Sequence, residues 1–384
     1  MIELNYAINT IFFLISGAMV MWMAAGFTAL EAGSVRTKNV TEILTKNVAL
    51  FSVASIAFLF LGYRLMYGWN EPDTHSMYAD FFFQMVFVAT AMSVVSGAVA
   101  ERKKLWSFLI FAAIFSAVIY PLEGAWTWGG GFLSKLGFFD FAGSGIVHMA
   151  GAAAALASVI MIGARDGKYD KNGKPQNIPG SNMPLVALGT LILWLGWFFF
   201  NGGSQLAFST IDDAKALGKI FVNTNMAAAG GLLGAMIVSK LWTKKVILNV
   251  TLNGALAGLV VITADPYSPS PEIAVLYGAL GGMLIPLSMT LLEKWGIDDP
   301  VGAISVHGTA GILGLMLVPI FNAEATALIQ LLGIGVIGGY VFVSSIVVWW
   351  VLHKTIGIRV GKEEESVGSD MYEGTGNAYP EFKK

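Results

Sequence analysis

Eleven apolar segments, each long enough to cross a bilayer, follow one another along this chain of 384 residues. A transmembrane helix needs about 20 consecutive apolar residues to cross about 30 Å of hydrocarbon. Only 12% of the residues are charged, which is about half the share found in a soluble domain. The sequence therefore predicts an all-α polytopic membrane protein. Its eleven transmembrane helices are placed at about 8–31, 45–67, 80–100, 105–126, 142–163, 184–204, 219–241, 247–265, 272–292, 300–321 and 326–352.

The composition excludes several kinds of chemistry. The chain contains no cysteine, which excludes disulfides, thiolate catalysis and cysteine-based metal sites. A net charge of −2 indicates no particular partner and gives no reason to expect nucleic acid. The segment from Met1 to Tyr6 carries no positive charge ahead of the first apolar run. We therefore expect that run to stay in the protein as a span and not to be cleaved as a signal peptide.

The basic residues are distributed unevenly between the two sets of alternating loops. One set, together with the C-terminal tail, holds 19 of the 23 Lys and Arg residues, and the other holds only Arg64, Lys135, Lys215 and Lys219. In membrane proteins the cytoplasmic loops carry the excess of Lys and Arg. With an odd number of spans, this distribution predicts an N-terminus outside, a C-terminus in the cytoplasm, and a multi-pass protein of the cell membrane.

Two of the four histidines, His148 and His307, lie deep inside apolar segments and share a local pattern. Asp140 and Asp299 precede them by eight residues, and a glycine lies three residues after each aspartate. An imidazole at bilayer depth is costly unless it faces a partner or a cavity, so it is a functional-site hypothesis by default. Two unrelated core histidines, bonded to backbone carbonyls, are the alternative, and the repeated spacing disfavours it.

The two motifs also predict how the spans are organised. The predicted orientation makes the fifth span run inward and the tenth run outward, so the motifs belong to inverted repeats. We expect two five-helix repeats at about 8–163 and 184–321, followed by an eleventh helix at about 326–352. Residues 1–355 would form one transmembrane domain, and residues 356–384 a cytoplasmic C-terminal tail. Transporters built from such repeats hold their substrate near the bilayer midplane, between the repeats.

The spacing of the motifs also places the histidines in depth. At 1.5 Å per residue, each histidine lies about 12 Å along its helix from its aspartate. Two segments entering from opposite sides would bring both imidazoles to the middle of the membrane, where they can hydrogen-bond to each other. Such a pair can relay a proton by tautomer exchange, or accept a hydrogen bond from a small polar solute. Two neutral histidines without a carboxylate or thiolate make a poor metal site, so we expect no metal and no cofactor.

Two explanations fit the aspartates. Asp140 stands where the N-cap of the fifth span belongs, as Asp298 or Asp299 does for the tenth, and capping alone would explain them. Alternatively, Asp140 lends negative potential to a cation site on the outer side of the membrane.

Aromatic residues gather near the predicted outer parts of the third, fourth and sixth spans. They are Phe87, Trp128, Trp197 and Phe200, and the hydroxyl of Ser204 lies beside them in the sequence. The face of a tryptophan and a hydroxyl acceptor suit a small hydrated cation, through cation–π attraction and a directional hydrogen bond. Each aromatic residue taken singly also fits the interfacial belt or the core.

Five runs of sequence carry a resemblance to a known family. In chain order they are Phe83-Gln84-x-x-Phe87…Gly97-Ala98-x-Ala100-Glu101-Arg102, Trp128-Gly-Gly-Gly131, Asp140-Phe-Ala-Gly143…His148, Gly196-Trp197-x-x-Phe200-Asn201-x-Gly203-Ser204 and Asp298-Asp-Pro300…Val306-His307-Gly308. They cover nearly the whole chain, and together they resemble the ammonium transporter family, in its Amt branch and not its Rhesus branch.

The resemblance implies which residues form the site. The family's outer ammonium-binding site matches Phe87, Trp128 and Ser204. Its phenylalanine gate matches Phe87 and Phe200, and its twin pore histidines match His148 and His307. Pore-lining or supporting positions match Phe83, Tyr120, Asp140 and Trp197. The run Ala29-Leu30-Glu31-Ala32 replaces a Phe-Tyr pair of some bacterial members, and we expect it at the outer vestibule.

The resemblance also implies a function, which is transport of ammonium and methylammonium by a homotrimer with one pore per subunit, without enzymatic activity. NH₄⁺ would be recruited outside, deprotonated, and conducted as NH₃ past the twin histidines, with or without a relayed proton. The tail is similar to the family's arm that meets PII-type signal proteins, but it is altered around Glu373–Gly376. An ammonium sensor that signals through this tail is the alternative. A general cation channel is disfavoured, because no carboxylate ring lines the spans.

Overall fold

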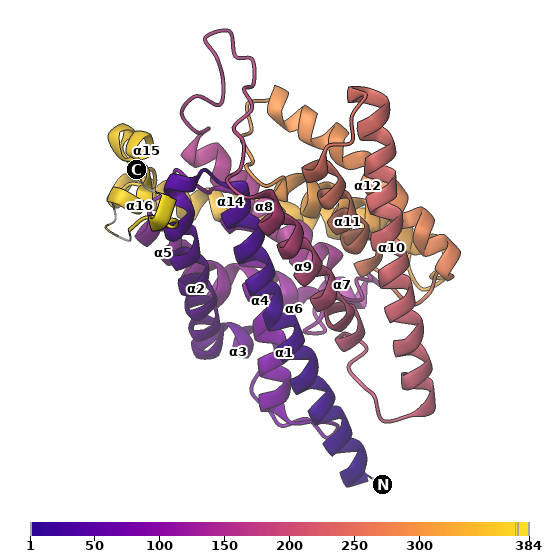
Figure 1. The fold of residues 1–384 in the computed structure, drawn as a ribbon. Coiled ribbons are helices and arrows are strands. Elements are labelled where there is room, and N and C mark those ends of the chain that lie inside the picture. Colours follow the sequence, from indigo (N-terminus) through magenta and orange to yellow (C-terminus); the bar gives the residue numbers. More distant parts are fainter. Residues whose placement is uncertain (1, 373, 375, 383–384) are drawn as a thin grey trace.

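The computed structural model describes residues 2–372, 374 and 376–382, and this part of the chain is helical, without a β-strand (Figure 1). Nine of its helices are long and apolar enough to cross a membrane, and two shorter apolar helices lie at Leu248–Thr263 and Ile304–Ile320. The nine are Ile2–Ser34, Thr37–Tyr67, Met77–Ala98, Leu105–Lys135, Ser144–Ile162, Met183–Gly203, Ile211–Thr243, Pro271–Lys294 and Ala327–Thr355. The prediction of an all-α polytopic membrane protein is therefore confirmed.

Several spans in the first half of the chain are helices with a π-helical insertion. The α-helices are α1 (Ile2–Ser34), α2 (Val40–Ala57), α3 (Tyr63–Tyr67), α4 (Met77–Ala98), α5 (Leu105–Ile114), α6 (Tyr120–Thr127), α7 (Phe132–Lys135) and α8 (Ala150–Ile162). The π-helical segments are η2 (Phe58–Gly62) between α2 and α3, η3 (Phe115–Ile119) between α5 and α6, and η4 (Ser144–Met149) before α8. Such insertions are rare and occur frequently at functional sites.

The second half of the chain contains the two spans that are shorter than predicted. Its α-helices are α9 (Met183–Gly203), α10 (Ile211–Thr243), α11 (Leu248–Thr263), α12 (Pro271–Lys294), α13 (Ala310–Leu317) and α14 (Ala327–Thr355), and the π-helical segment η5 (Ile304–Thr309) precedes α13. The helix α11 packs against α10 and α12, and most of its residues are buried. Because protein surrounds this helix, its length does not have to match the thickness of a bilayer.

Polar side chains set where the long helices of the second half begin. Asn182, Thr210, Ser270 and Thr326 each accept a hydrogen bond from a backbone N–H in the first turn of α9, α10, α12 and α14. These N-caps satisfy donors that have no partner inside the helix.

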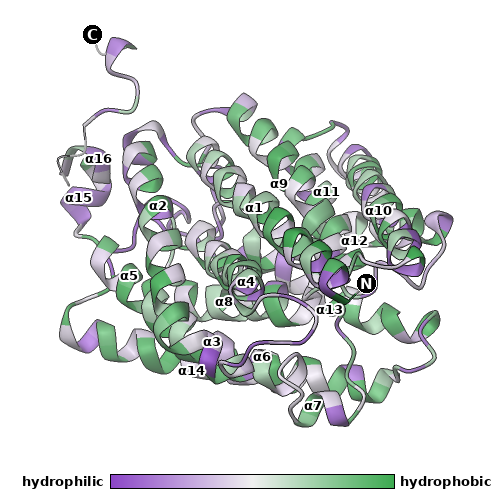
Figure 2. Ribbon diagram, turned by 90° about the horizontal axis from the view of Figure 1, so that it is seen from below, coloured by the Kyte–Doolittle hydropathy of each residue, from purple (hydrophilic) through white to green (hydrophobic). Residues whose placement is uncertain are grey.

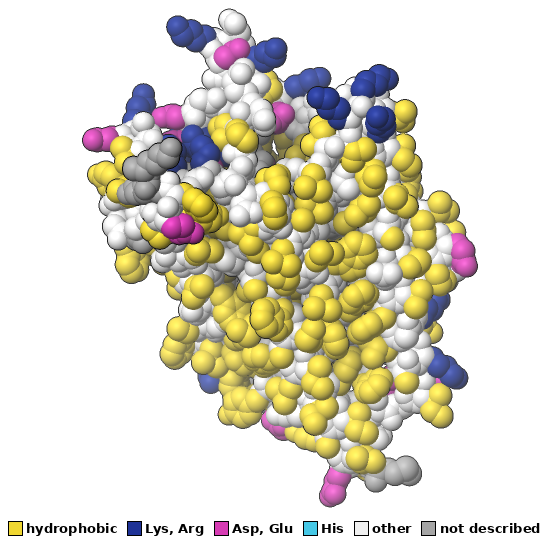
Figure 3. Space-filling view, in the orientation of Figure 1, with side chains coloured by type: hydrophobic (Ala, Val, Ile, Leu, Met, Phe, Trp, Pro, Cys, Tyr) yellow, Lys and Arg dark blue, Asp and Glu magenta, His cyan; other side chains and the backbone are white. Residues whose placement is uncertain are grey.

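The surface is apolar around the middle of the molecule (Figure 3). Large hydrophobic side chains are exposed there, including Phe60 at 78% and Trp106 at 72%. An apolar surface of this extent marks contact with lipid. Lys and Arg gather mainly at the end that holds the C-terminal tail, whereas the start of α1 lies at the opposite end. The ribbon seen along the bundle shows polar residues mainly in the loops and the tail (Figure 2).

The C-terminal tail folds back onto the helix bundle. Its helices α15 (Lys362–Val367) and α16 (Ser369–Tyr372) lie beside the start of α2. The carboxylate of Asp370 accepts the backbone N–H groups of Thr41 and Glu42, at 3.0 and 2.8 Å. We call this end of the bundle the tail side. Glu373 and Thr375, from the altered part of the tail, lie outside the described residues.

One expected position is wrong. We expected Glu31 at the outer vestibule, but it lies in the last turns of α1, at the end away from the N-terminus. There it is buried, and its carboxylate accepts a hydrogen bond from Lys46 Nζ at 2.7 Å. With the N-terminus outside, as the distribution of Lys and Arg predicts, this end of α1 would face the cytoplasm and not the outer vestibule.

Candidate functional site

Two short segments with the same local geometry hold the twin histidines. Gly143 and Gly302 adopt left-handed backbone conformations, with φ of 99° and 79°, immediately before the turns that lead into η4 and η5. Glycine adopts positive φ without the steric cost that a Cβ atom would add. Asp140 and Asp299 each accept backbone N–H groups from the residues that follow. The repeated sequence motif is therefore also a repeated structural motif.

The two imidazole rings meet inside the bundle. The Nδ1 atoms of His148 and His307 are 3.2 Å apart, and the ring centroids are 5.1 Å apart with the planes at 22°. The side chains are 0% and 3% exposed. One Nδ1 must donate and the other accept, so the two neutral rings adopt different tautomers.

Aromatic rings continue from the histidine pair in one direction. Phe87 stacks on Phe200, with centroids 4.2 Å apart and planes at 26°. Phe200 in turn stacks on His148 at 5.3 Å. Trp197 covers His148 from another side at 5.0 Å. The indole N–H of Trp197 donates to Thr263 Oγ1 at 2.8 Å, so it has a partner in the core.

A pocket of about 130 Å³ lies beyond the Phe87–Phe200 pair. We call it the aromatic pocket, and its wall consists of Tyr67, Phe83, Gln84, Phe87, Trp128, Phe141, Ser204 and Leu206. The structure thus brings together Phe87, Trp128 and Ser204, which are far apart in the sequence. The ring of Trp128 meets Phe87 edge-on at 6.0 Å. The Ser204 hydroxyl donates to the carbonyl of Phe200 at 2.8 Å, which leaves its oxygen able to accept.

Besides Ser204, the polar part of this pocket consists of Tyr67 and Gln84, and neither was predicted as a site residue. The hydroxyl of Tyr67 donates a hydrogen bond to Gln84 Oε1 at 2.9 Å. Gln84 lies three residues before Phe87 on α4, so both face the same side of that helix. The spacing was visible in the sequence, whereas the approach of Tyr67 from another span was not.

Capping accounts for the contacts of the Asp140 carboxylate. Its two oxygens accept four successive backbone N–H groups, from Gly143 to Ile146, at 2.8 to 3.2 Å. The residue is not part of the wall of the aromatic pocket. Its backbone carbonyl does act on the pocket, because it accepts the indole N–H of Trp128 at 3.0 Å. Tyr120 is also absent from the wall, and its ring lies 6.2 Å from Phe115.

Comparison of the sequence with models of known protein families identifies the family of this chain. The model of the Ammonium Transporter Family matches residues 11–379, which is nearly the whole chain.

The chain belongs to the ammonium transporter family.

Individual relatives agree with this assignment. The ammonium transporter Amt2 of Archaeoglobus fulgidus is 40% identical over 419 residues, which cover 98% of this chain and 89% of the relative. The ammonium transporter Amt2 of Methanocaldococcus jannaschii is 34% identical, over 98% of this chain and 92% of the relative. A solved structure named Sensor Amt Protein has a TM-score of 0.93 at 35% identity, covering 97% of this chain and all of the other. Candida albicans Mep2, at 24% identity and a TM-score of 0.85, shares the fold.

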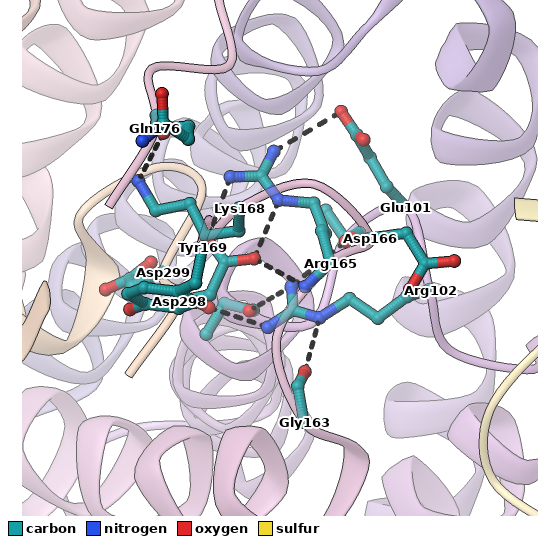
Figure 4. Close-up of polar contacts among 12 residues, drawn as sticks. Glu101, Arg102, Gly163, Arg165, Asp166, Lys168, Tyr169, Gln176, Asp298 and Asp299 are labelled. Atoms are coloured by element: carbon teal, nitrogen blue, oxygen red, sulfur yellow. Dashed lines mark hydrogen bonds and ion pairs between the residues drawn. The ribbon is translucent and has the colours of Figure 1, made fainter. Parts of the chain in front are cut away.

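In this ammonium transporter family member, a cluster of buried charges fixes the tail-side ends of the helices (Figure 4). Arg165 binds Asp298 with two parallel hydrogen bonds, from Nε and Nη2, both at 2.9 Å. Arg102 Nη2 donates to the carbonyl of Asp298 at 2.6 Å. Asp299 caps the tenth span and Asp298 does not, because the carboxylate of Asp298 is engaged with Arg165. Burial would raise the pKa of Asp298, but the hydrogen bond from Arg165 and the charges of Arg102 and Arg165 lower it to about 2.

We expect Asp298→Ala to destabilise the protein by about 3–5 kcal/mol, because it removes the bidentate partner of the buried Arg165 and leaves it only the longer ion pair to Glu101, at 3.5 Å. The thermal midpoint of the purified protein in detergent measures this loss. The folded-state pKa of Asp298 lies below its ordinary value of 3.8. Its contribution is therefore complete above pH of about 4 and is lost as the pH falls towards 2. Exposed Asp212, whose partner is Lys215 at 3.4 Å, is the control, and Asp212→Ala should change stability by less than about 1 kcal/mol. Equal losses in both variants would contradict the argument.

Proposed function

We propose that the chain transports ammonium across the cell membrane through a pore that runs from the aromatic pocket past the twin histidines. The observation that carries this proposal is the continuous line of side chains from Trp128 and Phe87 through Phe200 to His148 and His307. Membership of the ammonium transporter family supports the choice of substrate. Methylammonium is the second substrate, because it keeps the N–H donors of ammonium.

Capture takes place in the aromatic pocket. The face of Trp128 attracts the ammonium cation. The hydroxyl oxygen of Ser204 accepts a hydrogen bond from one N–H group of that cation. Beyond the pocket the path is closed by the stacked rings of Phe87 and Phe200 and lined by apolar groups. Carrying a bare charge into such surroundings costs many kcal/mol. Ammonium therefore gives up a proton near the phenylalanine pair and continues as ammonia.

The histidine pair gives the neutral molecule a polar path. A neutral imidazole offers one donor and one acceptor, so ammonia can hydrogen-bond to His148 and His307 in turn. The bond between their Nδ1 atoms also connects the two rings for proton exchange between tautomers. K⁺ has a radius similar to that of NH₄⁺ but has no proton to release, and this difference supplies selectivity that size does not.

The arrangement in the membrane belongs to the same proposal. Nine long and two shorter apolar helices amount to eleven spans, with the N-terminus outside and the tail in the cytoplasm, as the distribution of Lys and Arg favours. The paired motifs at η4 and η5 support two inverted repeats. We further propose a homotrimer with one pore in each subunit, and the docked tail as the surface for a PII-type signal protein.

Sensing is the second candidate function. It is favoured by the 35% identity and the TM-score of 0.93 to a structure named Sensor Amt Protein, and by the contacts that join α16 to the start of α2. A sensor would bind ammonium in the aromatic pocket and change the docking of the tail. It would then produce no ammonium flux, while ammonium would alter protease cleavage of the tail.

Transport can be tested with purified protein in liposomes. We expect an inward NH₄⁺ or methylammonium gradient to produce uptake, and an equal K⁺ gradient to produce a flux at least about 100-fold smaller, because a difference of about 2.7 kcal/mol in the barrier is enough for this ratio. Liposomes without protein give the background. Comparable fluxes of K⁺ and NH₄⁺ would contradict the deprotonation step, and absence of both would favour the sensor.

A further inference from the structure

A second, smaller cavity lies on the other side of His307 from the aromatic pocket. Its volume is about 20 Å³, which accommodates one molecule of the size of water or ammonia. His307 forms part of its wall and His148 does not. The ring of Phe27, which also lines it, is 6.1 Å from the ring of His307. A molecule that leaves the histidine pair towards the tail side therefore meets this cavity.

The wall of this cavity contains one carboxylate, that of Glu31. The residue is 1% exposed. Its Oε2 atom accepts hydrogen bonds from Lys46 Nζ at 2.7 Å and from the hydroxyl of Ser96 at 3.1 Å. Its Oε1 atom is buried and has no hydrogen-bond partner among the described residues. A buried carboxylate oxygen without a donor is costly, so this atom is a ready acceptor for an N–H group.

Lys46 holds the carboxylate in this position. Its side chain is fully buried, and Nζ also donates to the carbonyl of Ser96 at 3.0 Å. A buried ion pair of this kind adds little net stability, because the cost of removing both charges from water offsets their attraction. Stability alone therefore does not account for the pair. Its effect on the cavity is to hold the carboxylate of Glu31 in the wall, with Oε2 occupied by Lys46 and Ser96 and Oε1 left without a partner among the described residues.

We propose that Glu31 forms a second ammonium-binding site, in which Oε1 accepts a hydrogen bond from ammonia or ammonium after it has passed His307. This inference rests on the proposed transport function and adds a specific residue on the tail side of the pore. The rest of the wall is largely apolar, with Leu30, Val94 and Leu256 around the carboxylate. The polar side chains of Ser93 and Asn253 also line the cavity, but both donate to backbone carbonyls, so Glu31 supplies the one carboxylate of the wall.

The double variant E31Q/K46Q tests the site, because it removes both charges together and leaves no buried charge unpaired. Ammonium uptake is measured in vesicles sorted by the side on which the tail is accessible to protease. We expect the half-saturating ammonium concentration for entry from the Glu31 side to rise about tenfold, since a charge-assisted hydrogen bond is lost. For entry from the Trp128 side it should change less than about twofold.

The matched control is E42Q/K103Q, which neutralises another buried Lys–Glu pair outside the wall of this cavity. For this control we expect the half-saturating ammonium concentration to equal that of the wild type for entry from either side. Glu31→Asp is the second variant, because it keeps the charge opposite Lys46 and only withdraws the carboxylate, and it should shift the same side by a smaller factor. If wild-type protein transports ammonium and both Glu31 variants match it on both sides, the site holds water or is structural, and the inference is overturned. Wild-type protein without flux would instead remove the proposed function and this inference with it.

Discussion

His148→Asp is expected to let K⁺ through the pore. The substitution places a carboxylate where a neutral imidazole stands between Phe200 and His307. A negative charge in a space of low dielectric constant stabilises a cation strongly, so a charged ion no longer has to lose a proton to cross. We expect the K⁺ flux to rise from background to within about tenfold of the ammonium flux, measured as current in proteoliposomes under matched gradients.

His353→Asp is the control for this variant. His353 lies on the exposed side of the last turn of α14, away from the pore, so the same change of residue should leave K⁺ rejection as it is. Rejection of K⁺ by a folded His148→Asp protein, together with unchanged ammonium flux, would mean that the substrate does not pass the histidine pair. The proposed path would then have to be abandoned.

The sequence predicted those parts of the molecule that repeat or that depend on local pattern. Apolar length alone predicts the nine long helices, because each backbone group in lipid must be satisfied inside its own helix. The Asp140 and Asp299 motifs could be recognised because they repeat. In both, an aspartate accepts the free N–H groups at the start of a helix that begins inside the protein. The meeting of His148 and His307 then followed from the opposite directions of their spans.

Other parts of the site depend on contacts between distant segments. Tyr67 lines the aromatic pocket and Phe27 lies beside His307, and both come from spans whose apolar pattern gives no sign of a functional residue. Glu31 was assigned to the wrong side because its role depends on Lys46 and on the direction of α1. Tyr120 matches a family position, yet it is not part of the wall of the aromatic pocket. A single sequence carries no record of such contacts.

Asp140→Ala is expected to lower the free energy of unfolding by about 3 kcal/mol and to abolish ammonium uptake. The carboxylate satisfies four buried N–H groups at the start of η4, and hydrogen bonds to a charged group contribute about 1.5–3 kcal/mol each without being additive. Without the cap, the turn before His148 relaxes, and the carbonyl that holds the indole N–H of Trp128 moves with it. Both the aromatic pocket and the histidine pair lose their geometry.

The second copy of the motif provides the matched control. Asp299 is only partly buried, and it accepts N–H groups from Gly302 and Ile304 at 3.0 and 2.7 Å, so Asp299→Ala should cost about half as much stability. Because Asp299 has no contact with Trp128, its variant should keep the half-saturating ammonium concentration for entry from the Trp128 side, even if the maximal rate falls. Thermal midpoints and uptake kinetics of the two variants measure the difference. If they lose the same stability, and if substrate capture survives in both, then Asp140 acts only as a helix cap and the link from its carbonyl to Trp128 has no part in transport.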